Sequence, residues 1–382
     1  MWRFWICNSL TGARIREVFP LDGSWKTIAN GVGTGSHSFS LFHEVWLLER
    51  AGFTKAVAEA EVRSTWGSLT NPDGAKMAIV VCWDDTPVYA GLIKRRSIDD
   101  ANGVVTVHHD EIRSLLADRL THPVGGFGTG TWEISGVDLR SAAYLTILRA
   151  MAGRGFRWDV RLRGKSITPG SVQRTIWNFE QQTAEQILTE FQNTDGGPDV
   201  HFRPVWNAID AGLEWDPRLG APRLSGGIFD FVIGADNDGA TNLVTLEDTK
   251  KQITGVHVAG KGSEVDMRRG WAAESAPVGD GWLRDVVLPL KHIDSVPSLT
   301  AHGKALERAQ KYPTRQFTMS VRADGAPSDG TSGPTAADII PGTALRVLPS
   351  SLILADDWLS GYVISVSGDM SMDLSVDFQE VQ

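Results

Sequence analysis

The sequence predicts a β-rich α+β protein in which two β-barrel or sandwich domains flank an α+β middle region. Short alternating or β-branched runs recur at both ends of the chain, with turn residues between them. Helix-period patterns concentrate in the middle of the chain. The 382 residues are enough for two or three domains of roughly 100–200 residues each. We therefore expect domains at 1–108, 109–240 and 241–382.

Composition narrows the classes of function. The chain is 42% apolar and 22% charged, which is ordinary for a globular protein, and its 40 glycines and 17 prolines imply many turns. A net charge of −9 argues against a protein that grips nucleic acid through phosphates. It suits a surface that DNA passes without sticking, or one that meets basic partners. We find no secretory signal and no run as long as the ~18 apolar residues of a membrane helix. A soluble product without a membrane anchor, made in a cytoplasm, is expected.

Residues 1–108 are expected to be β throughout. Turn segments such as PLDGS and NPDG separate the candidate strands, and this spacing favours a sandwich or barrel. Cys7 and Cys82 are expected to be buried free thiols in two of the strands, although a disulfide stays open. No Cys/His spacing typical of zinc sites is present. The candidate strands are WRFWIC, RIREVF, HSFSLF, KMAIVVCW, PVYAGLIKR and GVVTVHH.

The middle region mixes helices and strands. DEIRSLLADRL and DLRSAAYLTILRAMAGRG have apolar residues on one helical face, and Gly153 and Gly155 should end the second helix. TAEQILTEFQ opens with a capping-box pattern from Thr183 to Gln186. The expected strands are WDVRLRG, VQRTIWNF, VHFRPVW and IFDFVIG.

Strand patterns return from residue 241. One helix, SLTAHGKALERAQKY, interrupts them, with Ser298 as its expected cap and Pro313 just past its end. Residues 323–338 are rich in Gly, Ser, Pro and Asp, which predicts an exposed and mobile loop. The expected strands are NLVTLEDT, QITGVHVAGKG, RQFTMSVRA, ALRVLPSS and GYVISVSGDMSMDLSVDFQEV.

The glycine-rich stretch NGVGTGSHSFSLF, residues 30–42, resembles a phosphate-binding loop. A P-loop requires a lysine after its last glycine and then a helix, and here Ser36 and His37 follow Gly35. The alternation of Phe39 and Leu41 with serines predicts a strand instead. We interpret the stretch as a hairpin or as a loop that another backbone approaches closely.

Other titratable clusters are weak candidates. HHDE, residues 108–111, suits a metal or acid/base site, but its place between a strand and a helix predicts that Asp110 or Glu111 serves the helix N-terminus. His43 and Glu44 should point to opposite sides of a strand. ADNDGAT, 235–241, lacks the spacing of a calcium loop. The carboxylate pairs Asp84–Asp85 and Asp356–Asp357 lie in turn-like segments. We therefore assign no catalytic, cofactor-binding or metal-binding residue.

The order of several loose motifs resembles the tail hub proteins of long-tailed bacteriophages. These are often named minor tail proteins in phages of actinobacteria, and they are similar to the baseplate hub of contractile tails. The resemblance spans most of the chain. The motifs that carry it lie at Trp25 to Gly33, Trp83 to Ile93, Thr183 to Leu188, Phe202 to Pro204, Ile253 to Gly262, Pro341 to Val347 and Gly361 to Asp369.

This resemblance implies a structural role at the tail tip of a virion. The family forms homotrimers in which two tube-like β domains per chain match the sixfold tail tube and distal tail ring. It implies a lumen through which DNA or the tape-measure protein travels without specific binding. The chain ends after its last expected strand at Gln382, so wall cleavage or receptor binding would fall to other minor tail proteins or fibres.

Two alternatives stay open from sequence. A β-rich enzyme acting on carbohydrate or peptidoglycan would stack tryptophans on sugars and use carboxylates such as Asp84, Asp85 and Glu111. A host-binding tip module would instead use exposed loops such as 323–338.

Overall fold

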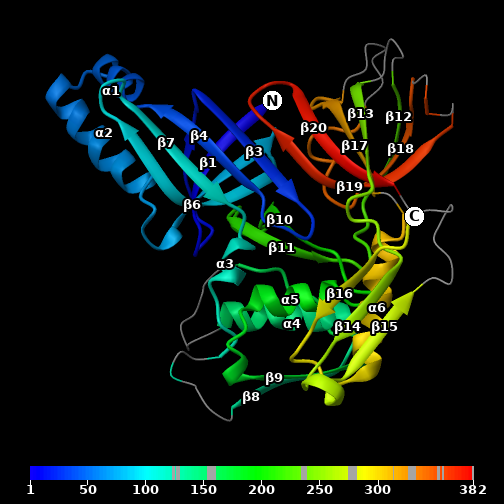
Figure 1. Cartoon of the computed structure of the whole chain (residues 1–382). Coiled ribbons are helices and arrows are strands. Elements are labelled where there is room, and N and C mark those ends of the chain that lie inside the picture. The colour runs from blue at the N-terminus through cyan, green and yellow to red at the C-terminus, as the bar shows by residue number, and fades with distance from the viewer. Residues whose placement is uncertain are drawn as a thin grey trace.

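The computed structural model describes residues 1–122, 125, 130–152, 161–233, 239–273, 282–312, 314–325, 333–350, 353–354 and 357–380. The fold is β-rich with a large, mainly antiparallel sheet and few helices, which confirms the predicted fold class. Figure 1 shows strands from both chain ends side by side in the upper part of the molecule. Helices of the middle region and a smaller sheet lie below them.

One sheet joins the two ends of the chain. Its main path runs β13 (Ala240–Asp248), β17 (Thr314–Arg322), β20 (Asp373–Glu380), β19 (Leu359–Gly368), β3 (Asp22–Ile28), β4 (Thr34–Ser40), β7 (Val104–Asp110), β6 (Thr86–Asp99), β5 (Met77–Trp83), β1 (Trp2–Asn8) and β2 (Arg14–Val18). Off this path, β18 (Ala344–Leu348) pairs with β19, and β12 (Ile228–Val232) pairs with β18.

The sheet crosses between the two halves of the chain at a seam formed by β19 and β3. These strands pair antiparallel, with Ser367 opposite Lys26 and Val366 opposite Thr27. The N–H of Ala29 extends the pairing by donating to the carbonyl of Ile364 at 2.8 Å. Apolar side chains from both halves form one core beneath the seam, including Trp25 and Val366. Backbone pairing and packing therefore join the halves together.

The N-terminal half contains a helical hairpin that the sequence patterns did not predict. The strand expected over HSFSLF ends at Ser40, whose hydroxyl accepts from the N–H of His43 at 3.1 Å and caps α1 (Leu41–Arg50). His43 and Glu44 therefore lie on a helix, not on a strand. The second helix, α2 (Lys55–Leu69), buries Ala58, Val62, Trp66 and Leu69. Its i, i+4 spacing explains why it packs on the sheet.

The middle region confirms most of the expected elements. α4 (Leu139–Ala152) and α5 (Ala184–Gln192) are present, and the capping box of Thr183 and Gln186 forms. The helix expected over 110–120 is only α3 (Ser114–Ala117), because β7 extends to Asp110. In the expected strand WDVRLRG, Leu162 makes an isolated bridge to Trp215. Gly153 and Gly155 lie outside the described residues. The strands here are β8 (Thr131–Val137), β9 (Pro169–Trp177), β10 (Val200–Trp206) and β11 (Leu213–Leu219).

The C-terminal region adds a three-stranded sheet of β14 (Gly255–Ala259), β15 (Arg269–Ala273) and β16 (Asp285–Pro289), which packs against α6 (Val296–Gln310). Ser295, not Ser298, caps α6, because its hydroxyl accepts from the N–H of Ser298. Pro313 lies outside the described residues, as do 326–332 of the expected loop. Ala323 and Ala336, near the ends of that loop, are buried rather than exposed.

Three short 3-10 helices complete the described elements: η1 (Asp73–Ala75), η3 (Asn178–Glu180) and η4 (Glu264–Asp266). Among the helices of the described ranges, none combines the length and the apolar character needed to cross a membrane.

Candidate functional site

Hydroxyl and charged side chains cover one face of the sheet at the seam, because alternate residues of each strand point to the same side. Cross-strand register aligns them in rows. Ser320 lies opposite Ser375, Ser375 opposite Ser367, and Ser367 opposite Lys26. A second row joins Ser24, Ser36, His108 and Arg95. We call these two rows, together with Thr34, Lys94, Asp110, Asp369 and Asp373, the polar face.

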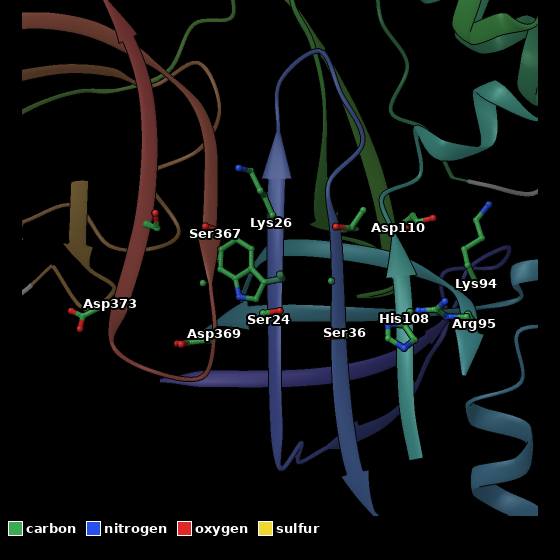
Figure 2. Close-up of a pocket in the computed structure, with 15 residues that line it drawn as sticks. Ser24, Lys26, Ser36, Lys94, Arg95, His108, Asp110, Ser367, Asp369 and Asp373 are labelled. Carbon is green, nitrogen blue, oxygen red and sulfur yellow. The ribbon is translucent and has the colours of Figure 1, made fainter. Parts of the chain in front are cut away.

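The polar face is hollowed into a wide, open trough of about 720 Å³. Figure 2 shows Ser24 and Lys26 on β3 and Ser36 on β4 near its centre. Asp369 and Asp373 lie toward one end, and Lys94 and Arg95 toward the other. The trough therefore spans strands from both halves of the chain.

Acidic partners hold several cations of this region. The Lys26 ammonium lies 3.0 Å from the Asp377 carboxylate, and the Lys94 ammonium lies 3.6 Å from Asp118. Asp377 also accepts hydrogen bonds from the hydroxyls of Ser365 and Thr318. Burial alone would raise the pKa of Asp377, but these hydroxyls and Lys26 lower it below its usual value. Two of the three lysine and arginine side chains of the polar face, Lys26 and Lys94, are therefore paired with carboxylates.

The opposite side of the same strands carries a buried histidine pair. The Tyr89 hydroxyl lies 2.8 Å from Nδ1 of His109, and Nε2 of His109 lies 2.9 Å from Nδ1 of His37. Burial lowers the pKa of His37 to about 4, and burial beside His37 also lowers the pKa of His109. Both rings are therefore neutral near pH 7. A side chain at Gly35 would collide with His109, since its Cβ would lie 2.4 Å from Cε1.

The HHDE segment splits between the two sides of the sheet, because β7 continues through it. His108 and Asp110 belong to the polar face, while His109 and Glu111 are buried. Glu111 does not serve a helix N-terminus: α3 has no acidic residue in its first turn. Instead, the Glu111 carboxyl group accepts from the Thr27 hydroxyl at 2.5 Å and from the Gly33 N–H at 2.8 Å. Burial raises the pKa of Glu111 to about 8.

The glycine-rich stretch fastens the N-terminal strands to the middle region. The N–H of Asn30 donates to the carbonyl of Val200 at 2.9 Å, and the N–H of Val200 donates back to Oδ1 of Asn30 at 2.7 Å. A Cβ at Gly33 would lie 2.0 Å from the carbonyl oxygen of Lys26. The expected close approach of another backbone is therefore present at Gly33, within the same chain.

The other candidate residues have separate partners. Asp84 pairs with the amino group of Met1, and Asp85 with Arg3. Asp357 caps the N–H of Trp358, while Asp356 and residues 235–238 lie outside the described residues. Cys7 and Cys82 are buried free thiols, as predicted. Within the described ranges, no three His, Cys, Asp or Glu side chains gather as metal ligands would.

Sequence reasoning missed Thr27, His201 and the polar face. The alternation of β4 indicated that one of its faces is polar, but β3 was not among the expected strands, because it begins inside PLDGS, which was expected to be a turn. The pairing of β3 with β19 also joins residues more than 300 positions apart. No local pattern contains that pairing.

No protein-family model and no curated protein sequence matches the chain. Solved structures do. A tail protein from Neisseria meningitidis MC58 aligns with a TM-score of 0.56 at 11% identity, over 99% of this chain and 96% of that one. The 43 kDa tail protein of prophage MuSo2 from Shewanella oneidensis aligns with a TM-score of 0.57 at 11% identity, over 100% of this chain and 98% of that one. The chain has the fold of phage tail proteins.

This tail-protein fold presents a second notable surface at the helical hairpin. None of the α1 side chains is buried, and Phe42, Trp46 and Leu47 are each more than two-fifths exposed. Figure 1 places the hairpin at the end of the molecule that is far from β12 and β13.

Proposed function

We propose that the chain is a structural hub protein of a bacteriophage tail tip that lines the channel for DNA passage. The observation that carries this proposal is the polar face, which extends over strands from both halves of the chain on a tail-protein fold. Its short hydroxyls and the carboxylate-paired Lys26 and Lys94 offer a passing phosphate backbone few strong contacts, and the net charge of −9 opposes adhesion.

In this proposal the chain acts as a homotrimer in the virion of a long-tailed phage. Residues 1–108 and 241–382 supply two tube-like domains, and residues 109–240 supply the middle domain. From the middle domain, β12 pairs with β18 of the C-terminal domain. Three copies would place six tube-like domains around one axis, which suits a sixfold tail tube and distal tail ring above. The tape-measure protein and other minor tail proteins or fibres would be the remaining partners.

Cysteine labelling tests the proposal. Light scattering on the purified chain should first show a trimer. Ser24→Cys and Ser375→Cys then place thiols on the polar face, and Ser64→Cys on the exposed side of α2 is the matched control; all three serines are exposed in one chain. The native thiols are buried and should react slowly. A small maleimide should label all three variants of the trimer.

A maleimide attached to a large protein should label only the Ser64→Cys control, because the other two thiols face a lumen of DNA width. A strict monomer at every concentration, or equal labelling of all three trimeric variants by the large reagent, would refute the proposal. We propose no enzymatic function, because Asp84, Asp85 and Glu111 each have a separate partner.

A further inference from the structure

A chain of hydrogen bonds crosses the junction between the N-terminal strands and the β10–β11 hairpin. NH1 of Arg218 lies 3.4 Å from Nδ1 of His201, whose Nε2 lies 2.9 Å from Oγ1 of Thr27. Thr27 contacts one carboxyl oxygen of Glu111 at 2.5 Å, and the N–H of Gly33 contacts the other at 2.8 Å. We call these five residues the Glu111 relay. Thr27, Glu111, His201 and Gly33 are buried, and Arg218 is partly buried.

The hydrogen bonds of the Glu111 relay can all be satisfied with donation running toward Glu111, and the protonation state of Glu111 decides whether it does. The Thr27 hydroxyl has one proton, so it donates either to Glu111 or to His201. An ionised Glu111 only accepts, so Thr27 donates to it and His201 donates to Thr27 through Nε2–H. Nδ1 of His201 is then a free acceptor, and Arg218 can donate to it. Every contact in this arrangement joins a donor to an acceptor.

A protonated Glu111 reverses the order. Its Oε2 still accepts from Gly33, and we place the proton on Oε1, because the Thr27 hydroxyl oxygen, 2.5 Å away, can accept it as a hydrogen bond. Thr27 then donates to Nε2 of His201, and the ring proton moves to Nδ1. Nδ1–H now faces NH1 of Arg218, which is also a donor, so that contact is no longer a hydrogen bond.

We propose that the proton on Glu111 sets the direction of the relay and thereby decides whether Arg218 is hydrogen-bonded to His201. Arg218 also donates to the carbonyls of Pro341, at 2.6 Å, and Ser225. Loss of one of its three contacts would therefore alter how the β10–β11 hairpin is held between the N-terminal strands and the segment that precedes β18. The inference concerns a single copy and is independent of the role in a tail.

The burial of Glu111 places the reversal of the relay at neutral to alkaline pH. Burial raises the pKa of Glu111 to about 8, so the relay should reverse in that range. Burial, with the nearby Arg218 and Arg203, lowers the pKa of His201, which keeps its ring neutral and leaves the tautomer as the variable. The titratable and charged groups around the relay are Arg113 on the Glu111 segment, Tyr89 on β6, His201 and Arg203 on β10, and Arg218 and Asp216 on β11.

Nitrogen NMR of the ring can read the direction. The full chain is labelled with ¹⁵N at its 9 histidines, and His201→Gln identifies the His201 signals. In the unchanged protein, we expect the Nδ1–H tautomer at pH 6 and the Nε2–H tautomer at pH 9. Glu111→Gln should hold the Nδ1–H tautomer at both values, because its amide donates permanently to Thr27. A single unchanging tautomer in the unchanged protein would overturn the proposal.

Hydrogen exchange at the Gly33 amide gives a second readout. A charged acceptor makes a hydrogen bond roughly twice as strong as a neutral one. At pH 9 the Gly33 amide should therefore exchange about fivefold faster in Glu111→Gln than in the unchanged protein. At pH 6 the two rates should agree. A ratio that is the same at both pH values would contradict the relay even if the ring signals proved too broad to assign.

Discussion

The Lys26 ammonium lies 3.0 Å from the Asp377 carboxylate, although 351 residues separate the two in the sequence. Lys26 belongs to β3 and Asp377 to β20, so the ion pair spans β19 and reinforces the seam between them. The hydroxyls of Ser365 and Thr318 also donate to Asp377, which makes this carboxylate the centre of a small network.

Asp377→Asn should destabilise the chain by about 1–3 kcal/mol, because it weakens three hydrogen bonds to one charged acceptor. Lys26→Met should cost less than about 1 kcal/mol, since the ammonium is 44% exposed and screened by solvent. Urea unfolding at pH 7 measures both. The folded pKa of Asp377 is lowered, so the difference between the unchanged protein and Asp377→Asn should persist above pH 3.8 and close as the pH falls below it. Equal costs for the two variants would contradict the network.

Gly33→Ala should cost about 2–4 kcal/mol or prevent folding, because the added Cβ would lie 2.0 Å from the Lys26 carbonyl and 2.7 Å from the Glu111 carboxyl. Gly31→Ala is the matched control in the same loop. Its Cβ would meet only the Ile28 side chain, at 3.2 Å, and should change stability by less than about 1 kcal/mol. Soluble yield and thermal unfolding compare the two. A Gly33→Ala protein as stable as the control would show that the loop is not tightly held.

Stability should fall as the pH decreases from 6.5 to about 4, because His37 stays neutral in the fold and takes up a proton when the chain unfolds. The lowered pKa corresponds to a loss of about 3 kcal/mol across this interval. His37→Gln keeps an acceptor for His109 but cannot titrate, so its stability should decline less steeply. Denaturant unfolding at several pH values provides the test, and parallel pH profiles would exclude His37 as the cause.

Arginines on the polar face should slow DNA passage if the face lines a channel, since each added cation can bind a phosphate. Phage particles carrying Ser36→Arg and Ser367→Arg should release DNA more slowly, and the delay should shrink at high salt. Particles with Ser64→Arg and Ser68→Arg, on the exposed side of α2, carry the same added charge as a control. Equal DNA release rates for the two sets of particles would show that the polar face does not line the channel.

Strands with a clear two-residue period could be predicted from sequence. Over its residues 373–378, β20 alternates buried and less buried residues, and its sequence DLSVDF shows the same alternation. The α1 helix was not predicted, because the alternation of apolar and polar residues in β4 continues from Phe39 to Leu41, which is the first residue of the helix. Leu41, Val45 and Leu48 have the i, i+4, i+7 spacing of a helix and pack, partly buried, against the core, but this run was interpreted as the end of a strand.

The candidate site could be predicted only in part. The strand expected after the glycine-rich stretch is present as β4, and the close approach at Gly33 was expected from its glycines. The buried contacts of Thr27 could not be predicted, because Glu111 reaches Thr27 across 84 residues and His201 reaches it across 174. Such contacts follow from sheet topology, and local periodicity carries no information on which distant strands will pair.

The pairing of β19 with β3 also determines how the molecule carries mechanical load. A pull on the C-terminal strands reaches the N-terminal strands in shear along main-chain hydrogen bonds, rather than through a flexible linker. A fragment lacking β19 would leave one edge of β3 without a partner, and a bare strand edge recruits strands from other molecules. Separately expressed halves should consequently aggregate where the intact chain stays dispersed.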